Sequence, residues 1–191
     1  MKILNRLAAF FAGVAFMLGV FAFAGAAEAL PKEKLAAFIV IDRCGEVSQE
    51  AAGSWRQVVK WAYHFPYYRL LDAEAGTQEA AIMLKKPVKN EAEVLAKAAA
   101  KCGADVVVVA RINTLTEKIV NSGLFDDGDT DVFIEISADL MVYKKEGAKL
   151  LKQPLRKRGR YESGNYEAPE ETVKWELSKL VNTMENRPII R

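Results

Sequence analysis

Residues 105–110 read Asp-Val-Val-Val-Val-Ala, and this short run of branched apolar residues decides the fold class. An apolar run of this length without alternation predicts a strand that is covered on both faces. A second run of the same kind covers residues 35–41 and ends at Asp42. Helical patterns separate the two runs, and strands that alternate with helices require a partly parallel sheet. We therefore expect Val106–Val109 to lie beside Phe38–Ile41 in one sheet.

The helices are predicted from apolar residues at helical spacing and from the residues at their ends. Ser48 and Asn90 are expected to cap two helices, because their side-chain oxygens can accept from free backbone N–H groups. Gly103 suits the left-handed position after a helix, and Pro169 suits a first turn. The predicted helices span residues 49–64 and 77–86, the segment from 91 to Gly103, and a last helix from Pro169; residues 67–72 form a further short strand.

The second half of the chain predicts an antiparallel hairpin. Residues 132–143 alternate strictly, with apolar residues at the even positions, so one face should be buried and the other exposed to water. A turn at residues 145–147 returns the chain into a strand that ends near residue 161, and Pro154, which has no N–H to donate, indicates a sheet edge or a bulge. The order β-α-β-α-α-β-β-β-α predicts an α/β (α+β) fold: a mixed sheet of about five strands with helices packed on it.

The first 29 residues have the pattern of a secretory signal peptide. Lys2 and Arg6 precede an apolar run over residues 7–24, and small residues at A-x-A spacing follow at 24–26 or 27–29. We expect cleavage to leave residues 30–191 as a single exported α/β domain, periplasmic or extracellular and associated with the cell envelope, without a transmembrane helix. The alternative is a permanent anchor, since the apolar run is about long enough to span a bilayer.

Three stretches resemble a known periplasmic α/β domain. They are residues 38–42 (Phe-Ile-Val-Ile-Asp), 98–109 (Ala-Ala-Ala-Lys-Cys-Gly-Ala-Asp-Val-Val-Val-Val) and 136–147 (Ile-Ser-Ala-Asp-Leu-Met-Val-Tyr-Lys-Lys-Glu-Gly). The domain is shared by the curli secretion channel subunit, the lipoprotein activators of penicillin-binding proteins and the amino-terminal domain of the Tol-system propeller protein. This sequence lacks the lipid-anchor cysteine of the lipoproteins and the long membrane-spanning hairpins of the curli pore. The resemblance therefore implies an envelope binding or assembly module and not a pore.

Catalytic and metal-binding signatures are weak. His64 is the single histidine and no G-x-S-x-G segment is present, so we predict no catalytic residues and no cofactor. Asp127, Asp129 and Asp131 have the first spacings of a calcium loop. The loop lacks the glycine at its sixth position and the glutamate at its twelfth. A solvated hairpin loop with Asx turns is the favoured interpretation, and no metal is predicted.

The two cysteines, Cys44 and Cys102, are expected to be free. Cys44 follows the carboxyl end of the first strand, whereas Cys102 precedes the beginning of a later one. Parallel strands would place the two thiols at opposite ends of the sheet, beyond the reach of a disulfide. Cys102 is predicted to be a small core residue.

Positive charge is concentrated in one tract. The chain has 27 basic and 25 acidic residues, yet residues 144–160 hold eight basic residues against Glu146 alone. In a strand, Arg156, Arg158 and Arg160 would face one way and could pair with anionic groups. The alternative is that these charges keep an edge strand from aggregating. The candidate binding residues are Arg156, Lys157, Arg158, Arg160 and Trp175.

Trp175 is included because it lies on the side of the last helix opposite Leu177 and would be an exposed partner anchor. It could equally cover a neighbouring loop, and Trp61 is a weaker case of the same kind. The sequence thus predicts a non-catalytic envelope binding or assembly module. Its partner would be another envelope protein or an anionic envelope component, not nucleic acid. Two alternatives stay open: a small hydrolase using carboxylates such as Asp42, Asp72 or Asp139, and a small-ligand carrier.

Overall fold

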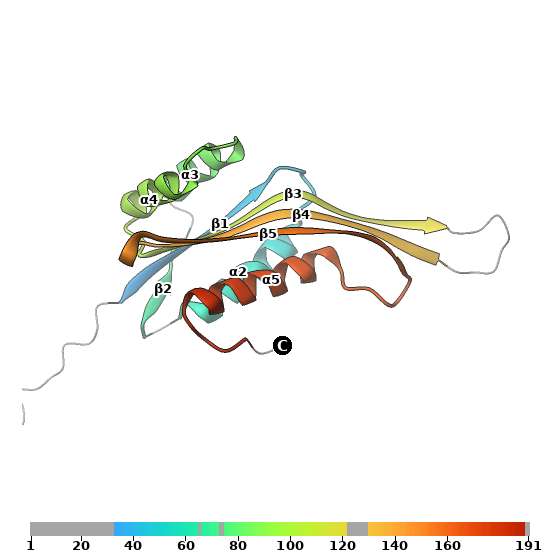
Figure 1. The fold of residues 1–191 in the computed structure, drawn as a ribbon. Coiled ribbons are helices and arrows are strands. Elements are labelled where there is room, and N and C mark those ends of the chain that lie inside the picture. Colours follow the sequence, from blue (N-terminus) through green and yellow to red (C-terminus); the bar gives the residue numbers. More distant parts are fainter. Residues whose placement is uncertain (1–32, 65, 73–74, 122–129, 190–191) are drawn as a thin grey trace, which may run out of the picture. The chain divides into compact units, whose positions relative to one another are not determined.

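The computed structural model describes residues 33–64, 66–72, 75–121 and 130–189, which form a five-stranded sheet flanked by four α-helices (Figure 1). Residues Glu33–Arg191 form one compact unit. The predicted leader lies outside the described residues. Among the described residues, no helix is both long and apolar enough to cross a membrane.

The sheet has the order β2-β1-β3-β4-β5. Strands β2, β1 and β3 are parallel, while β4 and β5 are antiparallel to their neighbours. Phe38 pairs with Val108 and Ile39 with Val109, which confirms that the two apolar runs are neighbours. The predicted mixed fold is also confirmed. The strands are β1 (Lys34–Asp42), β2 (Tyr68–Leu70), β3 (Val106–Asn121), β4 (Thr130–Lys144) and β5 (Lys149–Glu162).

The helix ends follow the predicted chemistry. The side chain of Ser48 accepts a hydrogen bond from the N–H of Ala51, and that of Asn90 accepts one from the N–H of Glu93. Gly103 has φ 70°, the left-handed conformation that ends the helix. The helices are α2 (Gln49–Ala62), α3 (Ala75–Lys85), α4 (Glu91–Cys102) and α5 (Pro169–Met184).

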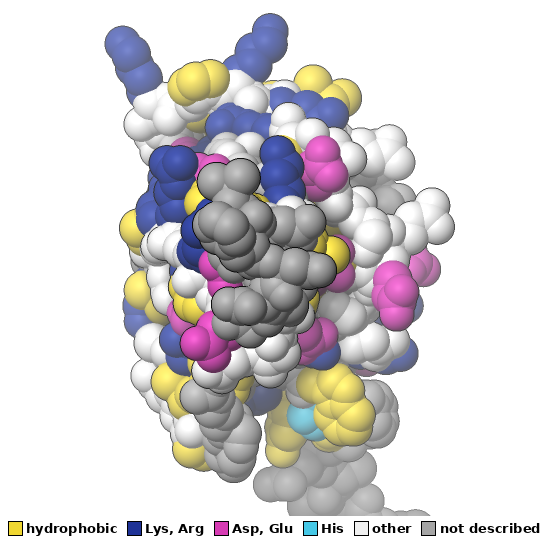
Figure 2. Space-filling model, turned by 90° about the vertical axis from the view of Figure 1, so that its right-hand side faces the viewer, with side chains coloured by type: hydrophobic (Ala, Val, Ile, Leu, Met, Phe, Trp, Pro, Cys, Tyr) yellow, Lys and Arg dark blue, Asp and Glu magenta, His cyan; other side chains and the backbone are white. Residues whose placement is uncertain are grey.

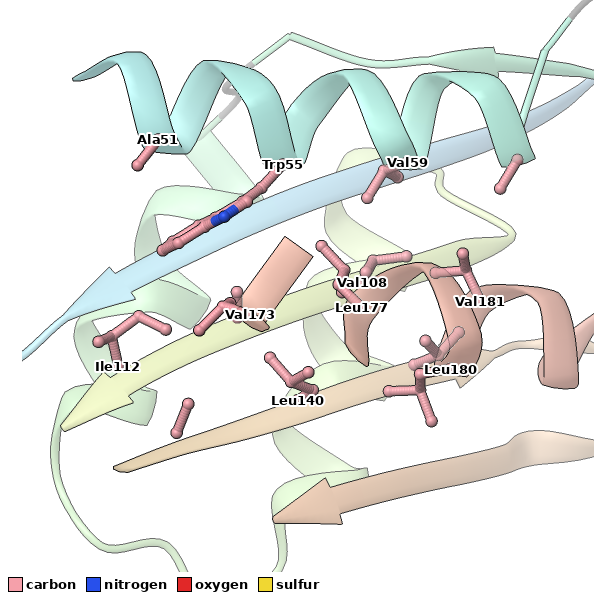
Figure 3. Close-up of a cluster of buried hydrophobic side chains, with 14 of the residues drawn as sticks. Ala51, Trp55, Val59, Val108, Ile112, Leu140, Val173, Leu177, Leu180 and Val181 are labelled. Carbon is pink, nitrogen blue, oxygen red and sulfur yellow. The ribbon is translucent and has the colours of Figure 1, made fainter. Parts of the chain in front are cut away.

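The helices form two layers, one on each face of the sheet. Helices α2 and α5 pack on one face, where Trp55 and Val59 point from α2 into the cluster formed with the sheet and α5 (Figure 3). The indole N–H of Trp55 also donates to the carbonyl of Glu170, at 3.0 Å, which ties α2 to the start of α5. Burial of these large apolar side chains is the main stabilising term of this layer.

Helices α3 and α4 cover the other face and correct one prediction. Met141 and Tyr143 lie at positions of β4 predicted to face water, but both are buried together with Leu84 and Leu95 of this helical layer. The strict alternation predicted an exposed face because the sequence of β4 does not show that α3 and α4 cover part of it. Asp139, on the same face, is also buried.

The ribbon β3–β4–β5 therefore has two parts, which we call the inner and outer segments. The inner segment comprises residues 106–112, 138–144 and 149–155, and it lies between the helical layers. The outer segment comprises residues 114–120, 131–137 and 156–162. A register shift between Ile112 and Thr114 separates the two parts. Figure 1 shows β3 and β4 continuing past α3 and α4, so one face of the outer segment, its open face, carries none of the described helices.

Candidate functional site

The exposed arginines of β5 gather on the open face of the outer segment. Alternation along the edge strand leaves Arg156, Arg158 and Arg160 exposed, and their Cα partners on β4 are Ser137, Glu135 and Phe133. Because paired residues of neighbouring strands share a face, these six side chains form one surface. Figure 2 shows Lys and Arg side chains gathered along the left and the top of this end of the molecule.

Each arginine of the row has different contacts. Arg156 lies 3.0 Å from Asp139, and its guanidinium also donates to the carbonyl of Ala138. Arg160 lies 3.5 Å from Asp131. Arg158 sits over the ring of Phe133, at 5.5 Å from its centroid. In the described part of the chain, no carboxylate oxygen lies within 4.0 Å of Arg158, so it is the arginine of the row without an ion pair, although its cross-strand partner is Glu135.

A buried charge cluster closes the inner end of this surface. Arg111 lies 2.9 Å from Asp139 and 2.6 Å from Glu91, and Lys152 lies 2.7 Å from Glu91. Burial alone would raise the pKa of Asp139, but hydrogen bonds from Arg111 and Arg156 outweigh it and keep that pKa below its ordinary value. The cluster links the first turn of α4 to β3, β4 and β5, so it holds Asp139, and through it Arg156, in place.

The other two predicted binding residues lie on the opposite side of the sheet. Lys157 alternates with the arginines, and its ammonium lies 5.5 Å from the ring centroid of Tyr161. Trp175 is on α5, where it is half-buried with the ammonium of Lys179 5.8 Å from its ring centroid. Trp175 is thus less exposed than predicted, because this neighbouring side chain of its own helix covers part of the indole. The arginine row and Trp175 do not form one surface.

The weak metal and cysteine candidates add no site. Asp127 and Asp129 lie outside the described residues, while Asp131 pairs with Arg160. Within the described ranges, no group of three or more His, Cys, Asp or Glu side chains could hold a metal ion. Cys44 is half-buried and Cys102 is buried, and both are free thiols. The parallel pairing of β1 with β3 places them toward opposite ends of these strands.

The carboxylates that an enzyme would need are not gathered. Asp42 pairs with Ile112 and Asp139 pairs with Arg111, so the two carboxylates point to opposite faces of the sheet. Burial would raise the pKa of Asp42, but hydrogen bonds from Cys44, Gly45 and Val47 keep it below its ordinary value. Asp72 is solvent-exposed and pairs with Arg56 at 3.1 Å. The three carboxylates thus serve different local contacts.

One exposed aromatic residue was underestimated from the sequence. Trp61, rated below Trp175, exposes 77% of its surface, more than any other large hydrophobic residue of the described chain. The sequence contains a signal for this exposure, because Trp61 lies two positions after the buried Val59 and therefore points away from it on the helix. Its neighbour along that face, Val58, also lines the groove beside it.

Comparison with known proteins finds likeness in structure only. No protein-family model matches this sequence, and no curated protein matches it. The hypothetical protein CT253 from Chlamydia trachomatis is 14% identical, with 80% of this chain and 95% of that chain covered and a TM-score of 0.44. Lipoprotein GNA1162 from Neisseria meningitidis is 14% identical, with 81% and 99% covered and a TM-score of 0.35.

The carboxyl-terminal domain of LpoB from Salmonella enterica is 9% identical, with 70% of this chain and 85% of that chain covered and a TM-score of 0.34. LpoB represents one of the three protein families that the sequence resembles. At these values of identity and TM-score, the likenesses assign neither a partner nor an activity to this chain.

Proposed function

We propose that this protein is an exported, non-catalytic binding module of the cell envelope, and that the open face of its outer segment holds an anionic envelope component. The single observation that carries this proposal is the exposed row of Arg156, Arg158 and Arg160. Arginine matches phosphate and carboxylate groups with two parallel hydrogen bonds. Alternate residues of a strand are spaced by roughly 7 Å, so the row can contact successive anionic groups on a polymer or a lipid surface.

The surroundings of the arginine row favour a role in binding over a role only in keeping the edge strand from aggregating. The ring of Phe133 lies under Arg158 and limits the conformations of its long side chain. The buried Arg111 holds Asp139 in place, so the carboxylate that pairs with Arg156 has a fixed position. Lys118, exposed on β3 and paired in register with Phe133, adds a further positive charge to this face. Charges that only protect an edge need no such positioning.

Export is the second part of the proposal, and it rests on the leader pattern and on the resemblance to periplasmic domains. Cells that express the full chain should contain an envelope form shortened by the residues before one of the two predicted cleavage sites. The intact mass of that form, measured after fractionation, decides between removal and retention. A protein that keeps residues 1–29 would refute cleavage and favour the permanent anchor.

Binding is tested with vesicles of phosphatidylglycerol and phosphatidylcholine, and with vesicles of phosphatidylcholine alone. The protein should sediment with the anionic vesicles at low salt and lose this binding as salt screens the charges. The triple variant R156A/R158A/R160A should bind at least about tenfold more weakly, since each lost phosphate contact weakens binding.

The matched control is K86A/K145A/K149A, which removes three exposed charges outside the outer segment. It should keep most of the affinity, because the proposal assigns binding to a surface and not to net charge. Equal losses in the two triple variants would refute the site, and unchanged binding in R156A/R158A/R160A would support edge protection instead.

A small-ligand carrier is the second candidate function, and a groove between α3 and α4 favours it. The groove encloses about 450 Å³, and apolar side chains such as Ala80, Met83 and Val94 line much of it. Gly76 allows the close approach of the helices, since a Cβ there would lie 2.9 Å from the Cβ of Lys101. An apolar fluorescent dye that binds wild type but not Ala80→Arg would support this role. Equal dye binding by both proteins would oppose it.

A further inference from the structure

A second groove lies on the other helical layer, between α2 and the carboxyl-terminal half of α5. It encloses about 280 Å³, and its lining residues are Val58, Trp61, Ala62, Ser178, Val181, Asn182 and Arg187. Trp61 stands at the rim, where 77% of its surface is exposed. The groove belongs to the layer opposite the arginine row, so it is independent of the proposed function.

The polar groups of this groove have unused hydrogen-bonding capacity. Within the described residues, the side chains of Trp61, Ser178 and Asn182 make no hydrogen bond to the protein. Arg187 donates from one nitrogen to the carbonyl of Ala62, at 2.5 Å, which fixes its guanidinium at the end of α2. No carboxylate of the described chain lies within 4.0 Å of that guanidinium, and none of the lining residues is acidic.

We propose that this groove binds one sugar ring of an acidic glycan. The apolar face of the ring would stack on the indole of Trp61, and its hydroxyl groups would meet the hydroxyl of Ser178 and the amide of Asn182. A carboxylate on the sugar would pair with Arg187. The arrangement fits a sugar because a small site combines one flat aromatic surface with several accessible polar groups that make no hydrogen bond within the described protein, and such groups orient a ligand.

A protein partner fits this groove less well. The aromatic anchors of protein interfaces are most effective in well-packed pockets from which water is excluded. Here the exposed Trp61 faces a shallow space edged by Ser178, Asn182 and Arg187, and burying these groups under apolar protein side chains would leave their hydrogen bonds unmade. Sugar hydroxyl groups supply the missing partners.

The probe is trigalacturonic acid, with maltotriose as the neutral comparison, added to ¹⁵N-labelled protein expressed from the full chain. The protein has three tryptophans, so the indole N–H signal of Trp61 is identified as the one that W61F lacks. Millimolar trigalacturonic acid should shift this signal to saturation. Maltotriose should bind about tenfold more weakly, because it has no carboxylate for Arg187.

Three variants test the site. W61A and R187A should each weaken trigalacturonic acid binding about tenfold or more, through loss of the stacking surface or of the charged partner. N182A should also weaken trigalacturonic acid binding. Because this variant leaves the hydrogen bond from Arg187 to Ala62 intact, it tests the site even if R187A folds poorly. In the control K86A/K145A/K149A the Trp61 signal should shift with trigalacturonic acid as in wild type, and W61A should bind anionic vesicles normally, so this proposal and the proposed function fail separately.

Three outcomes would overturn the assignment. The first is an unmoved Trp61 signal at millimolar concentration of both saccharides. The second is equal affinity for the acidic and the neutral saccharide, which would remove the role of Arg187. The third is a photo-crosslinking residue at position 61 that links only to protein in intact cells, which would assign the groove to a protein partner.

Discussion

The inner and outer segments of the β3–β4–β5 ribbon belong to the same strands but have different surroundings. In the inner segment, Met141 lies under α3 and α4 and is fully buried. Eight positions earlier on the same strand and the same face, Phe133 is half-exposed beneath Arg158. One continuous ribbon is thus covered on both faces in one half, whereas in the other half one face lies in the core and the opposite face presents a charged surface.

The boundary between the two segments explains how one ribbon can be covered on both faces in one half and open on one face in the other. The register shift after Ile112 and the buried cluster around Arg111 lie at the same level of the sheet, where the cover by α4 ends. Arg111 brings a buried positive charge to the last covered position, where Asp139 and Glu91, at the beginning of α4, both pair with it. The comparison teaches that the extent of the helical cover, and not the strand pattern alone, decides which side chains remain available for binding.

The largest expected effect is loss of the buried charge partner at this boundary. Asp139→Ala should lower the free energy of unfolding by about 3 kcal/mol or more, because it leaves the buried Arg111 with one carboxylate fewer. Asp131→Ala removes the half-exposed partner of Arg160 in the outer segment and should cost at most about 1 kcal/mol. Urea unfolding of the two variants measures the contrast, and equal costs would contradict the distinction between the segments.

A smaller contrast is expected from two apolar side chains on one face of β4. Met141→Ala should cost about 2–4 kcal/mol, because it leaves a cavity between β4 and the α3–α4 layer. Phe133→Ala should cost clearly less, since the ring is half-exposed and the site can fill with water. Thermal and urea unfolding test this order, and a larger loss for Phe133→Ala would show that the outer segment is covered by something else.

Strong acid should destabilise the charge cluster at the boundary between the two segments. Hydrogen bonds keep the pKa values of Asp139 and Glu91 below their ordinary values of 3.8 and 4.5, against the opposing effect of burial. Their stabilising contribution is therefore complete above those ordinary values and is lost as the pH falls through the lower values of the folded protein. Asp139→Asn should flatten the dependence of unfolding free energy on pH in this acidic range. An unchanged slope would mean that Asp139 titrates normally.

The smallest effect on stability is expected at the centre of the proposed site. Arg158→Ala should change the free energy of unfolding by less than about 0.5 kcal/mol, since the side chain is exposed and has no ion pair in the described structure. The same variant should weaken binding to anionic vesicles more than Arg156→Ala or Arg160→Ala, whose charges are partly neutralised. A large loss of stability would instead make Arg158 a structural residue.

The sequence predicted the secondary structure well because its signals were local. Ser48, Asn90, Gly103 and Pro169 act on the backbone within one helical turn, and the valine run from Val106 shows burial directly. Pro154 likewise indicated a sheet edge or a bulge, and the strand order places β5 at the edge. These predictions needed no knowledge of distant contacts.

The sequence could not show which parts of the sheet the second helical layer covers. Met141 and Tyr143 alternate like residues of an exposed face, and only the placement of α3 and α4 buries them. The pairing of Arg156 with Asp139 and the partial cover of Trp175 depend on side-chain contacts as well. The candidate site was therefore predicted as a row of charges, whereas its anchor, its aromatic support and its boundary came from tertiary structure.

The most direct test of the central claim is an NMR titration of the ¹⁵N-labelled protein with phosphatidylglycerol nanodiscs at low and high salt. We predict that backbone amide signals around Phe133, Arg158 and Arg160 change at low salt and return at high salt, while those of the inner segment around Val108 and Leu140 stay unchanged. Changes confined to the inner segment or to the α2–α5 layer, or no changes at all, would contradict the assignment of binding to the outer segment.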